Sequence, residues 1–335
     1  MTTRCLCPDH ADITPMALAG GQQPPDPSPS LRAALSETRL QRRPHVVAAW
    51  EALFHDLAST PDDRWPERFT AQRAQAPDVW DDPAWRSRFF QLYPSWFPAL
   101  WGTLPQAAPL IAAAELFKSP IKPATMEDCQ RWCMETANAM QRAFYQVQLR
   151  PFLPDPATLN YAAVEELLER VIDQIPPLVQ QVQNQRVSTA GGVHQRLVVR
   201  TLESLGWRPQ QEFEDLGSQT LGDIAVYGPG RTQCIVEVKS LNARERLRNS
   251  LAKVAQRHDA VVGIGFFHQA HEFNESATRE LVSTGALAVY MPAGTIAELH
   301  PSQQNARNRY QTAFYRPLAQ FAGDMQQFRQ TGRVP

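Results

Sequence analysis

The sequence predicts an α/β fold for residues 188–300, a mixed sheet flanked by helices, preceded by an all-helical region. Two observations support this prediction. Between residues 188 and 300, segments of helical period alternate with strand-like segments, which is the pattern of helices packed on a sheet. Before them, seven of the chain's eight tryptophans lie among helix-like stretches that proline often interrupts. Short, jointed helices with an aromatic core are therefore expected there.

The composition bounds the kind of protein. A chain of 335 residues with 43% apolar residues is long enough to bury a sizeable core. Its five cysteines are too few for a disulfide framework, and no signal peptide or membrane-length apolar run occurs, so a soluble cytoplasmic protein without membrane contact is expected. Lysine plus arginine (33) nearly equals aspartate plus glutamate (34). Any nucleic-acid-binding face must therefore come from local clustering.

Changes in composition predict four segments. Residues 1–30 are rich in Pro, Gly and Ser and are expected to form a flexible leader. Residues 31–180 are expected to form the helical domain, which serves DNA recognition, clamping or dimerisation. The α/β domain follows at 188–300. Residues 301–335 are polar and glutamine-rich and are expected to form a partly helical tail.

The elements of the α/β domain follow from periodicity and turn residues. The first helix places apolar residues on one face and stops at Gly206, and the last helix has Asn274 as its expected cap. The second and third strands are joined by the turn sequence GPGR. The fourth strand, DAVVGIGFF, is an almost continuous apolar run, as in a strand covered on both faces. The expected elements are helix 192–207, strands 211–215, 222–228 and 232–240, helix 243–258, strand 259–267, helix 273–285 and strand 286–291.

Three charged residues on the second and third strands form the candidate site. Asp223 begins one strand, and Glu237 and Lys239 are two residues apart on the next, so both project from the same face. Two converging carboxylates suit Mg²⁺, for which Mn²⁺ can substitute, and a neighbouring lysine can orient a water and stabilise developing negative charge. By itself, Glu-x-Lys is more often a solvated strand face with a weak ion pair. The otherwise apolar stretch CIVEVK favours a buried, paired site instead, because buried charges are costly.

These residues resemble the motif of the PD-(D/E)XK nuclease superfamily, which includes many type II restriction endonucleases and Holliday-junction resolvases. The motif is a strand-borne Asp, a turn, and Glu or Asp-x-Lys on the next strand, and Gly222 stands where the family usually has proline. The resemblance covers about 110 residues, roughly 188 to 300. It implies a restriction-endonuclease-like core in which Asp223 and Glu237 are metal ligands, the Val238 carbonyl is a further ligand, and Lys239 serves the attacking water.

The family often adds a glutamate on the first helix, and the corresponding position here is Gln195. A glutamine can hold a metal-bound water but adds no charge. Glu203, eight residues later on the same helix, is an alternative, although it is equally compatible with a solvated surface acid. The resemblance therefore leaves the number of metal ions open.

A basic cluster follows the third strand and is the expected DNA contact. Residues 239–257 carry six basic side chains against Glu245 alone. Such side chains bind the phosphodiester backbone without regard to sequence, although each one singly is as compatible with a solvated helix face. The expected DNA-binding residues are Ser240, Asn242, Arg244, Arg246, Arg248 and Lys253.

Together these features predict a Mg²⁺-dependent endonuclease that cuts double-stranded DNA, of the sequence-specific restriction type. A homodimer is expected because each core holds one catalytic centre and palindromic sites mirror two-fold symmetry. A restriction enzyme would also have a cognate DNA methyltransferase as its partner. Two alternatives stay open: a structure-selective nuclease of repair, recombination or phage defence, and a DNA-binding module of the same fold without catalysis.

Overall fold

The computed structural model describes residues 106–118, 120–149, 161–217, 221–239, 244–267 and 269–335. The predicted leader, residues 31–105 and 150–160 of the predicted helical domain, and the candidate DNA contacts Ser240 and Asn242 lie outside these ranges. The chain divides into two compact units, residues 1–117 with 132–189 and residues 118–131 with 190–335.

The described part of the first unit is helical. It contains α8 (Ala107–Lys118) and parts of two longer helices, α9 (Met126–Leu149) and α10 (Tyr161–Glu203), which the unit boundaries divide. Within this unit, the Cys133 thiol donates to the Leu110 carbonyl at 3.7 Å, which joins α9 to α8. Cys133 and Cys129 are both buried as free thiols.

The helix expected over residues 192–207 is the last part of a longer helix, α10. This helix runs without interruption from Tyr161 to Glu203 and contains Pro176, Pro177 and the glycines at 191 and 192. A glycine inside a helix costs only about 0.5–1 kcal/mol relative to alanine. Burial of Val193, Leu197 and other side chains in the following turns outweighs that cost. The helix ends where predicted, just before Gly206, whose φ of 79° suits a residue without a side chain.

The second unit is built on a mixed sheet of six strands in the order β1-β2-β3-β4-β5-β6. The first three strands pair antiparallel, and β3 to β6 pair parallel. The strands are β1 (Phe213–Asp215), β2 (Ile224–Tyr227), β3 (Gln233–Lys239), β4 (Ala260–Gly265), β5 (Ala288–Met291) and β6 (Tyr315–Pro317). The predicted order of helices and strands from 192 to 291 and the predicted mixed sheet are confirmed.

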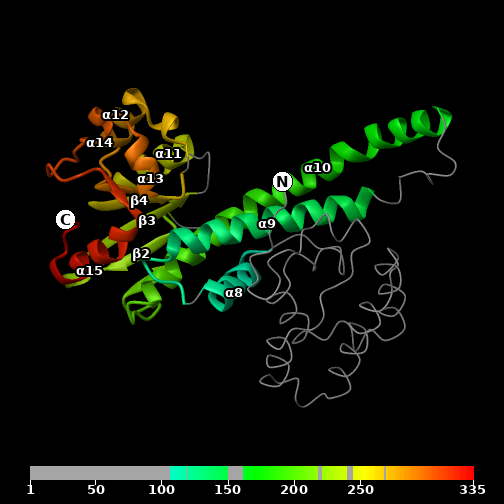
Figure 1. Cartoon of the computed structure of the whole chain (residues 1–335). Helices are drawn as coiled ribbons and strands as arrows, with labels where there is room; N and C mark the ends of the chain where they lie inside the picture. The colour runs from blue at the N-terminus through cyan, green and yellow to red at the C-terminus, as the bar shows by residue number, and fades with distance from the viewer. Residues whose placement is uncertain (1–105, 119, 150–160, 218–220, 240–243, 268) are drawn as a thin grey trace, which may run out of the picture. The chain divides into compact units, whose positions relative to one another are not determined.

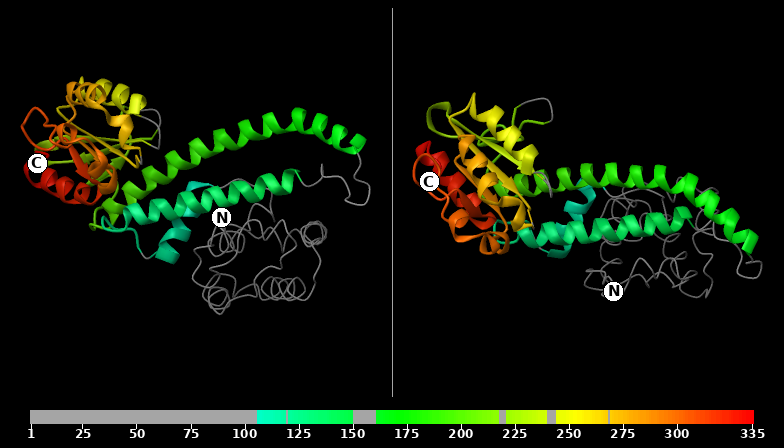
Figure 2. Two further views of the ribbon diagram at one scale, coloured as in Figure 1. Left: turned by 45° about the horizontal axis from the view of Figure 1, so that its top comes forward. Right: turned by 90° about the horizontal axis from the view of Figure 1, so that it is seen from above.

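Helices cover both faces of this sheet (Figures 1 and 2). On one face α11 (Arg244–Ala255) packs on β3 and β4, with α12 (Glu275–Ser283) beside it. On the other face lies α15 (Phe321–Thr331), where Tyr290 of β5 meets the Phe321 ring. Asn274 caps α12 as predicted, because its side chain accepts a hydrogen bond from the Ala277 amide. The shorter helices are η4 (Pro229–Arg231), η5 (Ala270–Phe273), α13 (Ala293–Glu298), α14 (Pro301–Gln304) and η6 (Leu318–Gln320).

The residues beyond 300 belong to the core, which corrects the expectation that the domain ends there and a polar tail follows. They add β6 to the sheet, parallel to β5, and α15 to its second face. The segment is polar on average, but its apolar residues recur at helical spacing, and Phe321, Met325 and Phe328 are buried. The expected partial helicity is confirmed by α15. None of the described helices is both long and apolar enough to span a membrane.

Candidate active site

The turn before β2 is shaped by a glycine. Gly222 has φ of 95°, and a Cβ atom added to it would lie 2.2 Å from Cγ2 of Ile235. Proline is fixed near φ −65° and any side chain would collide with β3, so glycine is required where the resembling family usually has proline. The turn delivers Asp223 to the sheet, and its amide donates to the Val236 carbonyl at 3.1 Å.

Asp223, Glu237 and Lys239 meet at one point, as predicted from the strand spacing. The Lys239 ammonium donates to Oδ2 of Asp223 at 3.2 Å and to Oε2 of Glu237 at 2.6 Å. The backbone amide of Val238 also donates to Oδ2 of Asp223, at 2.7 Å. The backbone and a side chain of β3 thus both hold the Asp223 carboxylate at the start of β2. The antiparallel pairing of β2 with β3 fixes this arrangement.

The site lies on the face of the sheet that α11 covers. Residues i and i+2 of a strand share a face, so Ile235, Glu237 and Lys239 point the same way. Ile235 packs in a core cluster with Leu247 and Leu251 of α11. Glu237 is only 4% exposed, and the Lys239 and Asp223 side chains are 19% and 27% exposed. The Glu237 carboxylate is therefore buried, whereas the Asp223 and Lys239 side chains are partly open to solvent at the end of β3.

Burial and neighbouring charges shift the pKa values of Glu237 and Lys239. Burial raises the pKa of the Glu237 carboxyl above its ordinary value, the neighbouring Asp223 adds to this, and the Lys239 ammonium opposes it. Burial also acts to lower the pKa of Lys239, but the two carboxylates outweigh it, so that pKa lies above its ordinary value. The lysine is consequently a cation at neutral pH, held between two acids.

The donor set suits a hard divalent cation. Two carboxylates already converge closely enough for a single positive group, the Lys239 ammonium, to contact both. Carboxylate and carbonyl oxygens are the ligands that Mg²⁺ prefers, and Mg²⁺ commonly keeps several waters. Among the described residues no group of three or more His, Cys, Asp or Glu side chains is arranged to hold a metal. A cation at this site would therefore depend on Asp223, Glu237, backbone oxygen and water.

Gln195 lies on a neighbouring element and contacts a different acid. Its Nε2 donates to Oδ1 of Asp215 at 2.6 Å. Asp215 ends β1 and pairs with Ile224, the residue after Asp223. Directly opposed residues share a face, so Asp215 projects with Ile224, and the side chain preceding Ile224 belongs to the other face. The polar pair Gln195–Asp215 thus lies one strand away from Asp223 and on the opposite face of the sheet, and Asp215 was not among the predicted site residues.

The alternative acid on α10, Glu203, forms an ion pair with Arg200 at 2.7 Å. The Arg200 and Glu203 side chains are 47% and 30% exposed, as in an ordinary ion pair on a helix surface. Glu203 is therefore paired with Arg200 on the helix surface.

The four predicted basic contacts on α11 fall into two groups. Arg244 donates to the Glu272 carbonyl at 2.8 Å and Arg248 pairs with Glu280 of α12 at 2.6 Å. Arg246 and Lys253 are exposed and are seven residues apart, two helical turns along one stripe. The sequence could not separate these groups, because both have the same composition and differ only in which flank of α11 faces α12.

An open hollow of about 600 Å³ lies between η5 and the segment joining α13 to α14. It is formed by η5 and the segment joining α13 to α14, both of which lie beyond the carboxyl ends of parallel strands. Its polar lining includes Gln269, His271, Asn274, Glu298, His300 and Gln303.

The fold agrees with that of a solved nuclease. The structure titled "Metal-depleted Ecl18kI in complex with uncleaved, modified DNA" superposes with a TM-score of 0.51 at 9% sequence identity, over 74% of this chain and 84% of that one. This is a restriction-endonuclease-like fold.

Two further structures are similar to this restriction-endonuclease-like chain at lower scores. A second Ecl18kI complex with uncleaved DNA has a TM-score of 0.49 at 11% identity, covering 79% of this chain and 84% of that one. A complex of restriction endonuclease PspGI with substrate DNA has a TM-score of 0.46 at 14% identity, covering 67% and 93%. No protein-family model matches the chain, and no curated protein matches it in sequence.

Proposed function

We propose that this protein is a Mg²⁺-dependent endonuclease that hydrolyses phosphodiester bonds in double-stranded DNA. The observation that carries the proposal is the convergence of Asp223 and Glu237 on one ammonium group at an edge of a restriction-endonuclease-like sheet. The structurally similar protein was solved in complex with DNA, which supports DNA as the substrate. Taking a carboxylate out of water beside a second acid is costly, which supports a site that binds a cation.

Each residue of the site has a part in the proposed hydrolysis. Asp223 and Glu237, with the Val238 carbonyl, would hold Mg²⁺, or Mn²⁺ in its place. A bound Mg²⁺ supplies neutralisation of charge at the scissile phosphate and acidification of a water. Lys239 is charged at neutral pH and can donate to that water or to a phosphate oxygen. In the proposal Gln195, which donates to Asp215, can hold a second water.

The restriction type of specificity extends the proposal. Each chain holds one such site, so cutting both strands of a duplex favours a homodimer whose two-fold axis matches a palindromic target. A restriction enzyme requires a cognate methyltransferase in the same cytoplasm to protect the host DNA. The exposed stripe of Arg246 and Lys253 would hold the DNA backbone, and Ser240 and Asn242 directly follow Lys239 in the sequence.

Plasmid DNA and synthetic four-way junctions, each incubated with the protein in Mg²⁺ or in EDTA, test this function. Discrete fragments from plasmid in Mg²⁺ and none in EDTA are expected. The Lys239→Ala variant should lose cleavage at least about hundredfold, as removal of one group that stabilises the transition state commonly does. Lys122→Ala, an exposed lysine away from the site, serves as the matched control and should cut normally.

Other outcomes point elsewhere. Cutting of junctions alone would indicate a structure-selective enzyme, and irregular degradation would remove the restriction type. DNA binding without cleavage of any substrate in either metal would contradict the nuclease proposal and leave a binding module of the same fold.

A further inference from the structure

A second surface lies at the edge of the sheet opposite the candidate active site. The segment between α14 and β6 places Arg309 against the Asp259 carbonyl at 2.5 Å and Asn308 against the Leu287 carbonyl at 2.7 Å. Asp259 and Leu287 immediately precede β4 and β5, so this loop lies at the amino ends of the parallel strands. Lys239 ends β3 at the carboxyl edge, roughly 20 Å away over the six residues of β4.

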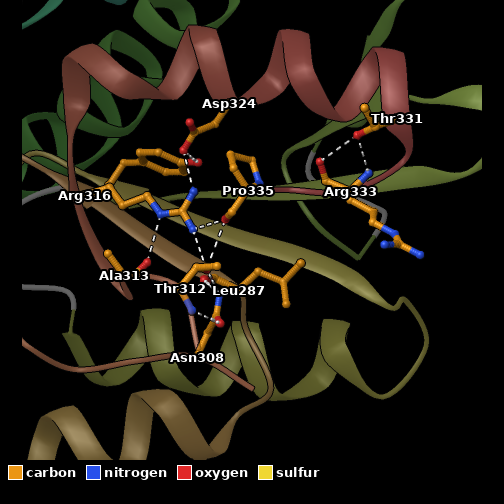
Figure 3. A network of polar contacts seen from close by, with 10 residues as sticks. Leu287, Asn308, Thr312, Ala313, Arg316, Asp324, Thr331, Arg333 and Pro335 are labelled. Carbon is orange, nitrogen blue, oxygen red and sulfur yellow. Dashed lines mark hydrogen bonds and ion pairs between the residues drawn. The ribbon is translucent and has the colours of Figure 1, made fainter. Parts of the chain in front are cut away.

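The base of this loop is rigidly held. Asn308 is 3% exposed, and its side-chain oxygen accepts from the amides of Tyr310 at 2.9 Å and Thr312 at 3.1 Å. Below it, Thr312 and the buried Arg316 both donate to the Pro335 carbonyl (Figure 3). Arg316 also forms an ion pair with Asp324 of α15 at 2.5 Å. Hydrogen bonds of Asn308, Thr312 and Arg316 therefore hold the base of this loop against the sheet.

The tip of the loop presents an aromatic ring beside an arginine. Tyr310 is 61% exposed, and the Arg309 guanidinium lies over its ring, 5.0 Å from the ring centroid. Among the exposed large apolar side chains of the described residues, Tyr310 is the one aromatic. The next residue, Gln311, has a left-handed backbone with φ of 64°, and its amide donates to the Asn308 carbonyl. A non-glycine residue in this conformation persists where its surroundings enforce it, often at a functional surface.

The loop and the segment before β4 carry a net positive charge. Arg307 and Arg309 are exposed on the loop, and Arg257 is exposed two residues before Asp259, whose carbonyl Arg309 contacts. Against these three cations, the adjoining segment carries one exposed acid, Asp259. The surface thus combines a preorganised aromatic face with several cations, in a protein whose overall charge is close to zero.

We propose that residues 307–311 bind a single-stranded nucleic-acid segment, with a base stacked on Tyr310 and phosphates held by Arg307, Arg309 and Arg257. Stacking on an aromatic side chain with flanking basic groups is the general means of binding single strands, and it tolerates any base. In an intact duplex the bases already stack on each other. The Tyr310 ring can therefore stack only on a base that is unpaired. The binding goes beyond the proposed cleavage and does not involve Asp223, Glu237 or Lys239.

Fluorescence anisotropy of a labelled oligothymidylate, titrated with the full chain in EDTA, tests this surface. An oligonucleotide of about ten residues is within the usual site sizes of single-strand-binding folds. Tyr310→Ala is expected to weaken binding roughly tenfold, and Tyr310→Phe, which keeps the ring, should stay within about twofold of the native chain. Arg307→Ala should lower the slope of log affinity against log salt by about 0.7.

Two controls separate this surface from general charge and from the candidate active site. Arg279→Ala removes an arginine of α12 that is 76% exposed, and it should leave binding unchanged. Lys239→Ala should also bind normally, even where it no longer cuts DNA. A protein that binds the oligonucleotide through Tyr310 but cuts no DNA would contradict the proposed nuclease function alone.

Three results would overturn the inference. They are equal affinities of Tyr310→Ala and the native chain, absence of binding by the native chain, and loss of binding in Lys239→Ala but not in Tyr310→Ala. The last would place the single strand at the catalytic edge. Tighter binding of a blunt duplex through Tyr310 would likewise contradict the assignment to single strands.

Discussion

At the scale of single residues, the site depends on one glycine as much as on its three charged side chains. Gly222 combines a backbone with φ of 95° and direct contact with Ile235 on the neighbouring strand. Gly230, in the turn between β2 and β3, also has positive φ, at 61°, but a Cβ there would meet nothing within 4 Å. A comparison of substitutions at Gly222 and Gly230 can therefore distinguish the cost of backbone strain from the cost of a steric collision.

Gly222→Ala should destabilise the fold by about 2–4 kcal/mol, since it adds overpacking to the strain of a positive φ. Gly230→Ala should cost only about 1 kcal/mol, the strain alone. Urea denaturation measures both. The Gly222 variant should also lose cleavage, because the turn that delivers Asp223 must shift. Equal losses of stability in the two variants would contradict the assigned collision with Ile235.

The second residue-scale prediction concerns Glu237 and pH. Because burial raises its pKa above the ordinary 4.5, the metal-free fold favours the protonated carboxyl. This contribution to stability is complete below 4.5 and is lost as pH rises through the higher value of the folded state. Glu237→Gln keeps the side chain neutral at every pH. In EDTA near neutral pH the variant should therefore melt above the native chain.

The same variant should lose the metal response. Ionised Glu237 is a proposed ligand, so added Mg²⁺ should raise the melting temperature of the native chain and not that of Glu237→Gln. Glu245→Gln, with a side chain that is 77% exposed on α11, should match the native chain in both measurements. A Glu237→Gln protein that melts below the native chain at neutral pH would show that the Lys239 pair, rather than burial, dominates.

At the scale of elements, α11 has three distinct sides. Leu247, Leu251 and Val254 are buried against the sheet. The Arg248 side is occupied by Glu280 of α12, and the Arg246 side is open. Helical period accounts for this division, since residues seven apart return to the same stripe and residues two apart lie about 160° away from each other.

Arg246→Ala and Lys253→Ala should each lower the slope of log DNA affinity against log salt by about 0.9, the release of one counterion. Arg248→Ala should have a smaller effect, because its guanidinium must first leave Glu280. Arg244→Ala should instead reduce stability by about 1–2 kcal/mol through the lost bond to the Glu272 carbonyl. Salt titrations of duplex binding and urea denaturation distinguish these cases. Equal slopes for all four variants would contradict the division of α11 into sides.

At the scale of the whole molecule, the sheet is completed by the last residues of the chain. The network of Arg316, Asp324, Tyr290 and Pro335 joins β5, β6, α15 and the end of the chain (Figure 3). Arg316 has a side chain only 5% exposed, so its charge is paired in a desolvated place. Loss of one partner there is costly, because it leaves the other charge buried and alone.

A chain ending at residue 300 should fail to form a cooperatively folded domain. It lacks Phe314, Phe321, Met325 and Phe328, each fully buried. Burial of such a side chain contributes roughly 1.5–3 kcal/mol, and four of them approach the whole stability of an ordinary domain. Near-ultraviolet circular dichroism and thermal unfolding provide the measurement. Native-like spectra with a cooperative transition would contradict the assignment of this segment to the core.

A milder change tests the same region in the full chain. Arg316→Met should destabilise the protein by about 3–5 kcal/mol, since Asp324 is left without its cation. The double variant Arg316→Met, Asp324→Leu should recover most of that loss, because no buried charge remains. A single variant as stable as the double one would show that the ion pair contributes little.

The sequence by itself determined the local order of the second unit and the chemistry of its site. Strand period placed Glu237 and Lys239 on one face, and the glycine-proline turn brought Asp223 beside them, because these are contacts between neighbours in the chain. Apolar alternation and helix stops gave the mixed sheet and its elements up to residue 291.

Only the tertiary structure decided features that depend on contacts between distant segments. Residues 315–331 join the sheet and its second face, and Gln195 pairs with Asp215. Arg244 and Arg248 contact neighbouring elements, at the Glu272 carbonyl and at Glu280. In the tertiary structure α10 also continues through its two glycines, where local helix propensity alone predicts that the helix ends. The physical reason is the same in each case: burial and charge pairing are set by what lies across the fold, and local periodicity carries no information about that partner.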